Sequence, residues 1–170
     1  MVPPATRRAY VARGLAVVLL LGIVASWQSA TDYVRTAFEN GKTAEARQEV
    51  RRMGERAVAA YARDGAVCPS ASHPVPVDLE SIVRLGKFQS LQAEWKEDEA
   101  RHAGFACLGF EMEKLQYYQY AYEATPTSFI ARARGDLDGD HVSSTFELHG
   151  HVTDGHLVVE PKLRETASYE

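Results

Sequence analysis

Hydrophobic and polar residues alternate along much of the last third of the chain. The apolar members of this alternation are Phe129, Ala131, Ala133, Phe146, Leu148, Gly150 and Val152. A period of two is typical of β-strands, in which successive side chains point to opposite faces. Asp154-Gly155 is a favoured hairpin turn, and a further apolar run follows it. The pattern predicts an antiparallel meander of about four or five strands, with extended chain from Phe105 onward.

The preceding part of the chain has the period of a helix instead. Between Thr31 and Arg63, apolar residues recur at helical steps: Val34, Ala37, Phe38, Val50, Met53, Ala57 and Tyr61. Mixed charges fill the other sides, which is typical of a solvated face. Gly54 costs the helix about 1 kcal/mol relative to alanine, and Asn40-Gly41 is a candidate kink. A proline-containing connector follows, in which residues 78–85 are expected to form a short helix.

Composition is that of a globular chain with one core: 170 residues, 45% hydrophobic and 25% charged. The net charge of -4 gives no reason to expect a nucleic-acid partner. The two periodicities predict the α+β class, with a long N-terminal helix packed on a C-terminal antiparallel sheet. The expected segments are a basic leader (residues 1–13), an apolar anchor (14–30) and the rest of the helix (31–63). A connector (64–104), the sheet (105–163) and a tail (164–170) follow.

Near the N-terminus, an apolar run follows three arginines. Arg7, Arg8 and Arg13 precede it, and no charge falls between Arg13 and Asp32. Basic residues before an apolar run keep the N-terminus in the cytoplasm, so that the rest of the chain is expected on the other side of the membrane. We interpret the run as a retained anchor with Trp27 at its interface. The alternative is a cleavable export signal that ends near Ala30.

Two cysteines, Cys68 and Cys107, fit an exported domain. Outside the cytoplasm an even pair more often forms a disulfide than two thiols. The bond is predicted to tie the loop after the long helix to the sheet and to add about 3–4 kcal/mol of stability. The alternative is two thiols that pack as small hydrophobic side chains.

An acidic loop between two of the predicted strands has the spacing of a calcium ligand set. Asp136, Asp138 and Asp140 stand at places one, three and five of this run, and Glu147 stands at place twelve. Calcium prefers such oxygen ligands, and the backbone carbonyl of Val142 would supply place seven. The run departs from the usual pattern at place six, where His141 replaces glycine. The hypothesis is a structural Ca²⁺ that holds a hairpin connection, and the alternative is an acidic turn without metal.

Two further groups of side chains are weaker candidates for binding. Alternate tyrosines in one strand, at 118, 120 and 122, could stack a ligand, but packing within the sheet explains them more simply. His149, His151 and His156 are expected on one strand face and could hold zinc or copper, but no familiar ligand spacing supports them. The sequence contains no nucleophile motif and no glycine-rich phosphate loop, so no enzymatic activity is expected.

Several stretches resemble a run found in pilin-like proteins of predatory and gliding bacteria. They are Cys107-Leu-Gly-Phe110, Tyr117-Tyr-Gln-Tyr120, the segment from Phe129 to Asp140, and Ser144-Thr-Phe146. The arrangement of anchor, helix, connector and sheet is likewise similar to that of type IV pilins and pseudopilins. The resemblance covers residues 105–150 most closely, and over the first hundred residues only helix and anchor are shared.

Such a resemblance implies a single-pass protein of the bacterial inner membrane, with its C-terminal part in the periplasm or on an extracellular filament. Its partners would be other pilin or pseudopilin subunits, joined through the N-terminal helix, and a pseudopilin calcium site would correspond to the three aspartates. Processing after Gly14 would start the mature chain at Leu15. Leu19 then stands where the family has glutamate, as in some minor subunits. The alternative is a solitary exported binding module that does not assemble.

Overall fold

The computed structural model describes residues 41–79, 88, 90, 92–137 and 139–167. The chain divides into two compact units, residues 1–39 and 40–170, and the described residues belong to the second. The predicted leader, the apolar anchor and the start of the predicted helix lie outside the described residues. Residues 80–85 of the predicted short helix do so as well. Within the described residues, no helix combines the length and the apolarity needed to cross a membrane.

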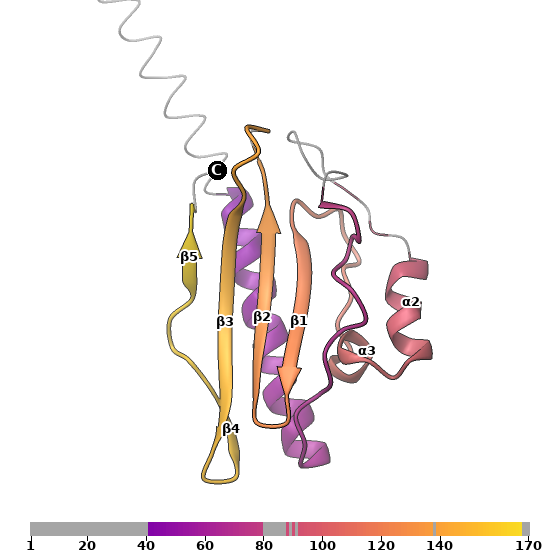
Figure 1. Cartoon of the computed structure of the whole chain (residues 1–170), viewed down its shortest axis with the longest axis vertical. Coiled ribbons are helices and arrows are strands. Elements are labelled where there is room, and N and C mark those ends of the chain that lie inside the picture. Colours follow the sequence, from indigo (N-terminus) through magenta and orange to yellow (C-terminus); the bar gives the residue numbers. More distant parts are fainter. Residues whose placement is uncertain (1–40, 80–87, 89, 91, 138, 168–170) are drawn as a thin grey trace, which may run out of the picture. The chain divides into compact units, whose positions relative to one another are not determined.

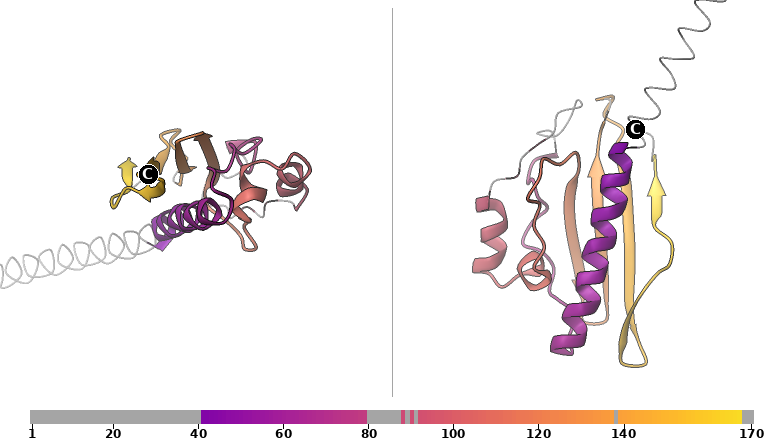
Figure 2. Two further views of the ribbon diagram at one scale, coloured as in Figure 1. Left: turned by 90° about the horizontal axis from the view of Figure 1, so that it is seen from below. Right: turned by 180° about the vertical axis from the view of Figure 1, so that it is seen from behind.

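A long helix occupies residues 41–64 and covers one face of the sheet (Figures 1 and 2). Its buried residues follow the predicted helical period, and they include Thr43, Ala46, Val50, Met53, Ala57 and Ala60. The helix comes especially close to the sheet at Gly54. A Cβ atom placed on Gly54 would stand 2.5 Å from Cδ2 of Leu148. The absence of a side chain at Gly54 therefore sets how closely helix and sheet pack.

Among the described residues, five antiparallel strands form the sheet: β1 Gln119–Thr125, β2 Ser128–Gly135, β3 Ser144–Thr153, β4 His156–Val159 and β5 Arg164–Thr166. The first four follow one another as a meander, and β5 pairs with the opposite end of β3 from β4. The α+β class and the strands predicted from the alternation are thereby confirmed. The turn at Asp154-Gly155 is confirmed as well, and it joins β3 to β4.

The two faces of the sheet differ in chemistry. The face under the long helix carries the buried side chains Tyr118, Tyr120, Tyr122, Phe129, Ala131, Ala133, Phe146, Leu148 and Leu157. The other face, called the outer face here, carries charged and polar residues from the alternate positions of β1, β2 and β3. No described helix covers it (Figure 2). The tyrosines thus pack within the core, as the simpler interpretation expected.

Beside β1 lies a region in which the structure departs from the sequence-based expectation. Residues 105–110 were predicted as extended chain, but Gly104–Leu108 forms helix α3, which follows helix α2 at Gln92–Ala100. The carboxylate of Asp98 accepts hydrogen bonds from the backbone N–H groups of Phe105 and Ala106 at the start of α3. Gly109 ends the helix in the left-handed conformation, with φ of 61°. A buried cap thus makes this short apolar run helical.

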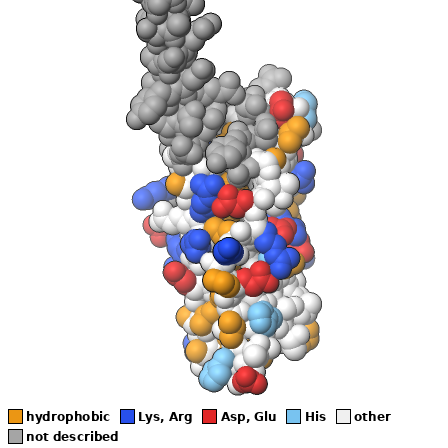
Figure 3. Space-filling view, turned by 90° about the vertical axis from the view of Figure 1, so that its left-hand side faces the viewer, with side chains coloured by type: hydrophobic (Ala, Val, Ile, Leu, Met, Phe, Trp, Pro, Cys, Tyr) orange, Lys and Arg blue, Asp and Glu red, His pale blue; other side chains and the backbone are white. Residues whose placement is uncertain are grey.

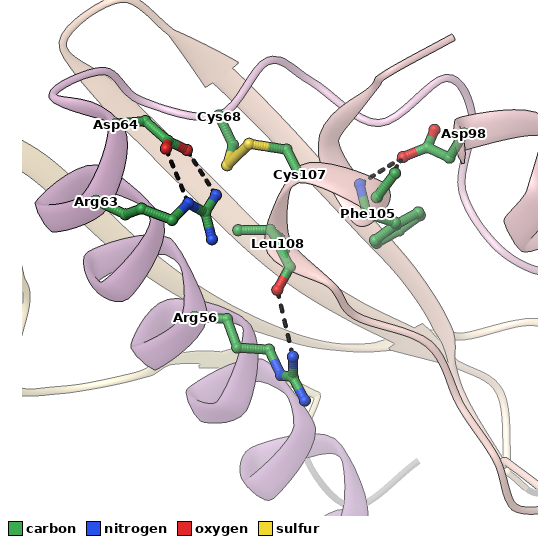
Figure 4. The surroundings of a disulfide bond; sticks show 9 residues. Arg56, Arg63, Asp64, Cys68, Asp98, Phe105, Cys107 and Leu108 are labelled. Carbon is green, nitrogen blue, oxygen red and sulfur yellow. Dashed lines mark hydrogen bonds and ion pairs between the residues drawn. A yellow bond between two sulfur atoms is a disulfide. The ribbon is translucent and has the colours of Figure 1, made fainter. Parts of the chain in front are cut away.

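The connector runs along the free edge of β1. Val75 exchanges backbone hydrogen bonds of 2.8 Å with Tyr120, and Ala71 donates one of 2.8 Å to Tyr122. Cys68, at the start of the connector, forms a disulfide with Cys107 in α3, as Figure 4 shows. The structure joins the two cysteines that were predicted to pair, and it links the connector to α3 rather than to a strand. The connector therefore shields an edge that would otherwise expose unpaired backbone groups.

Candidate functional site

The acidic loop between β2 and β3 is wound around the side chain of Asp136. Asp136 is 2% exposed, and its two carboxylate oxygens accept hydrogen bonds from the backbone N–H of Gly139, at 2.7 Å, and of His141, at 2.9 Å. Gly139 and His141 both have positive φ, 80° and 72°. His141 thus adopts a conformation that usually favours glycine, as its place in the run suggested. The Asp136 carboxylate satisfies these backbone groups and organises the turn.

The other residues of the predicted ligand set lie in different surroundings. Asp140 is exposed, and its Oδ1 accepts a hydrogen bond of 2.7 Å from the backbone N–H of Val142. Val142 is itself exposed. Asp138 lies outside the described residues. Glu147 lies within β3, opposite Arg132. The β2–β3 ladder ends at the loop with the pair Gly135 and Ser144, and Glu147 lies three residues further along β3. At about 3.3 Å per residue, this places Glu147 roughly 10 Å along the strand from the loop.

Calcium would need several of these oxygens together. Among the described residues, no three acidic, histidine or cysteine side chains cluster in a way that could hold a metal ion. Asp136 and Asp140 have the right oxygen chemistry and lie on one short loop, and each carboxylate oxygen of Asp136 has a second lone pair beyond its backbone hydrogen bond. These two aspartates therefore have the chemistry that Ca²⁺ prefers, whereas Glu147 is engaged by Arg132 and His149.

Glu147 belongs to a network of ion pairs on the outer face. Its Oε1 accepts a hydrogen bond of 2.6 Å from Nε of Arg132, and its Oε2 lies 3.2 Å from Nε2 of His149. Nη1 of Arg132 also donates to Glu123, at 2.7 Å. Burial raises the pKa of the Glu147 carboxyl, but the hydrogen bonds and charges of Arg132 and His149 outweigh it, and the pKa lies below its ordinary value of 4.5. The network joins β1, β2 and β3 across the outer face.

The three histidines predicted to share a strand face do so. His149 and His151 occupy alternate positions of β3, and His156 stands opposite Thr153 in the β3–β4 ladder, on the same side. His151 and His156 are exposed, whereas His149 is half-buried against Glu147. In the view of Figure 3, histidines (pale blue) are visible toward the lower end of the molecule. As stated above, no cluster of histidine, cysteine or acidic side chains among the described residues could hold a metal ion, and this includes the three histidines.

A groove beside this network was not predicted from the sequence. It has a volume of about 280 Å³ and lies between residues 71–74 of the connector and the outer face of β1 and β2. Arg132 and Arg134 line it together with Gln119 and Ala121. The sequence signal that could have indicated this groove was the alternation of β2, which places Arg132 and Arg134 on the polar side of the strand. The sequence did not show that the connector would pack beside them.

The chain matches no protein-family model, no curated protein and no solved structure.

Proposed function

We propose that this chain is a structural, pilin-like subunit, such as a minor pseudopilin, anchored in the bacterial inner membrane with its sheet outside the cytoplasm. The observation that carries the proposal is the long helix on one face of an antiparallel meander. In the sequence, this helix follows an apolar segment with a basic start, which is suited to a membrane anchor. The proposal rests on this combination and on the resemblance of the sequence motifs in residues 105–150 to those of pilin-like proteins, which is an expectation from the sequence alone.

The disulfide supports a location outside the cytoplasm. Cys68 and Cys107 have an S–S distance of 2.02 Å, and such bonds persist in oxidising compartments. The bond fixes α3 to the connector, next to the C-terminal end of the long helix (Figure 4). Arg56 on that helix donates a hydrogen bond of 2.6 Å to the carbonyl of Gly109, just after α3. The disulfide and this hydrogen bond thus link α3 directly to the connector and to the long helix.

A calcium ion held by Asp136, Asp138 and Asp140 is part of the proposal, with the carbonyl of Val142 as a further ligand. When bound, the ion would offset the mutual repulsion of the three carboxylates and link both ends of the loop. Glu147 would contribute only after leaving Arg132 and His149, so we assign it to the outer-face network. Asp136 would remain the fixed ligand, because the backbone already holds its carboxylate.

Mass spectrometry of the full-length protein, purified from bacterial membranes, tests the proposed anchor and processing. A mature chain that starts at Leu15 or an intact chain, recovered from the membrane fraction, is expected. If the wild type is cleaved after Gly14, a Gly14→Leu variant should keep the leader that precedes Leu15. A chain that starts near Thr31 in the soluble fraction would instead support a secreted binding module. Such a module is also suggested by the groove on the outer face.

Thermal unfolding of the same protein tests the calcium ion. A ligand present at about 100 times its Kd stabilises the folded state by about 2.7 kcal/mol, so chelator should lower the Tm of the wild type by roughly 5–10 °C. Asp138→Asn should have the lower Tm in calcium and should not respond to chelator. Asp154→Asn is the matched control, because it removes a carboxylate from the other hairpin turn. An unchanged wild-type Tm in chelator would refute the metal but not the anchor.

A further inference from the structure

The groove on the outer face has a small residue beneath it and polar groups around it. Gln119, Ala121 and Glu123 occupy alternate outer-face positions of β1, and Ala121 has the smallest side chain of the three. Ala121 stands opposite Arg132, and Gln119 stands opposite Arg134. Because Ala121 does not fill the space beside Arg132, a hollow is left between the two strands and residues 71–74 of the connector.

Two arginines line this groove, and they differ in their partners. Arg132 is half-buried and pairs with two carboxylates, those of Glu147 and Glu123. Arg134 is exposed, and it makes no hydrogen bond or ion pair with any described residue. Its neighbours across the strands, Gln119 and Thr145, are neutral. The guanidinium of Arg134 is therefore available to an anion, whereas that of Arg132 is already occupied.

The connector wall of the groove is fixed in place. The backbone N–H of Ser72 donates a hydrogen bond of 2.6 Å to Asp98, and Nε2 of His73 lies 3.0 Å from a carboxylate oxygen of Glu97. The backbone pair of Val75 with Tyr120 holds the next part of the connector against β1. A preformed wall reduces the ordering cost of binding, so a small ligand can be retained by few contacts.

Gln119 adds a polar group of known orientation. Its Nε2 donates a hydrogen bond of 2.7 Å to the carbonyl of Pro76 and a second, of 3.3 Å, to that of Val77. Both amide protons are thus in use, which leaves the amide oxygen as the group of Gln119 that can meet a ligand, as an acceptor. The groove therefore offers one unpaired guanidinium and one acceptor, which suits a carboxylate that carries a nearby N–H or O–H donor.

We propose that this groove binds a small organic monocarboxylate, held by the guanidinium of Arg134 next to Gln119. Charge favours a monoanion over a dianion such as phosphate. Arg132 already has two carboxylate partners, Glu123 and Glu147, and His73 faces Glu97, so Arg134 is the one basic side chain without a carboxylate partner among the described residues that line the groove. A planar guanidinium also matches a carboxylate in a two-bond geometry. The proposal does not depend on assembly into filaments.

NMR titration of the full-length protein in detergent micelles tests this site at constant ionic strength. N-acetylglycine is the probe, because it combines a carboxylate with an amide N–H, and N-acetylglycinamide is its neutral counterpart. The Arg134 Nε–H signal and the backbone amides of residues 71–74 and 119–121 should shift in a saturable way with the acid and not with the amide. Arg134→Gln should weaken binding by at least about tenfold, since a charge-assisted pair is lost.

Two further variants make the test specific. Arg134→Lys keeps the charge but loses the two-bond geometry, so its affinity should fall between those of the wild type and Arg134→Gln. Arg63→Gln removes a charge at the end of the long helix from a residue that does not line the groove, and it should leave binding unchanged. Intact circular dichroism of all three variants would exclude loss of the fold.

The proposal would be overturned if N-acetylglycinamide caused the same shifts as N-acetylglycine, or if Arg134→Gln bound the acid as tightly as the wild type does. Tighter binding of inorganic phosphate than of the acid, or shifts spread over arginines outside the groove, would overturn it as well. So would an Arg134 signal that moves on dilution without any probe, because a second copy of the chain would then fill the groove.

Discussion

Replacing Gly54 by alanine should destabilise the protein, although alanine is the better helix former. In a helix without close neighbours the change would stabilise by about 1 kcal/mol. Here the new methyl group would stand 2.5 Å from Cδ2 of Leu148 and 3.8 Å from Cγ1 of Val159. Leu148 is 2% exposed and cannot easily turn away. Overpacking of this kind costs about 1–3 kcal/mol, so the net expectation is a loss of up to about 2 kcal/mol.

Gly41 provides a matched control in the same helix. A Cβ atom there would meet nothing within 4 Å. Gly41→Ala should therefore stabilise by about 0.5–1 kcal/mol, opposite in sign to Gly54→Ala. Urea titration of the full-length protein, followed by circular dichroism, measures both free energies of unfolding. Near Tm, each 1 kcal/mol corresponds to roughly 2–4 °C in a chain of this size.

A double-mutant cycle with Leu148→Ala identifies the contact. Leu148→Ala alone should cost about 2–5 kcal/mol, because it leaves a cavity. In the double variant the methyl group of residue 54 would enter that space, so the combined loss should be smaller than the sum by more than about 0.5 kcal/mol. If Gly54→Ala stabilised as much as Gly41→Ala, or if the two losses simply added, the close packing of helix and sheet at Gly54 would be refuted.

Three further predictions concern the disulfide and two titrating side chains. Cys107→Ser should lower the free energy of unfolding by about 4 kcal/mol in urea titrations, because the bond with Cys68 closes a loop of roughly 40 residues. The pKa of Glu147 is lowered on folding, so its contribution is present above pH 4.5 and lost as the pH falls through the folded value. Glu147→Gln should therefore reduce the loss of stability measured in acid. Burial raises the pKa of Tyr122 well above 10.0, so its contribution is lost as the pH rises past 10. Because its hydroxyl has no hydrogen-bond partner within the described part of the chain, Tyr122→Phe should preserve stability at neutral pH and reduce the loss measured in alkali.

Each of these has a result that would contradict it. Equal stability of wild type and Cys107→Ser under oxidising conditions would mean that the bond does not form. An acid-unfolding curve of Glu147→Gln parallel to that of the wild type would mean that Arg132 does not hold this carboxylate. A marked loss of stability at neutral pH in Tyr122→Phe would show that the hydroxyl has a partner, such as a bound water.

The strands could be predicted from the sequence because their alternation reports burial directly. Phe129 to Ala133 and Phe146 to Val152 each place every second residue under the helix, and no other regular structure has that period. The period also put the three histidines on one face. The disulfide was predictable as well, since there are only two cysteines to join.

Residues 104–108 could not be predicted, because a short apolar run is compatible with a strand or with a buried helix. The deciding group, Asp98, lies in a stretch that the sequence presents as a charged surface, yet it is 1% exposed. From helix propensity alone, Gly54 was predicted only to destabilise the helix relative to alanine. Its closeness to Leu148 depends on which strand residue faces it, which no local pattern contains.

The two faces of the sheet should respond independently to mutation. Gly54 of the helix meets Leu148 on the helix-covered face of the sheet, whereas the side chain of Arg134 is exposed on the outer face and makes no hydrogen bond or ion pair with a described residue. Surface substitutions away from such partners usually change stability by less than about 0.5 kcal/mol, and effects at separate sites usually add. Arg134→Gln should therefore weaken carboxylate binding by at least about tenfold at nearly wild-type stability, while Gly54→Ala should lower stability with the groove intact. A combined variant whose loss of stability exceeds the sum by more than about 0.5 kcal/mol would show that the faces are coupled.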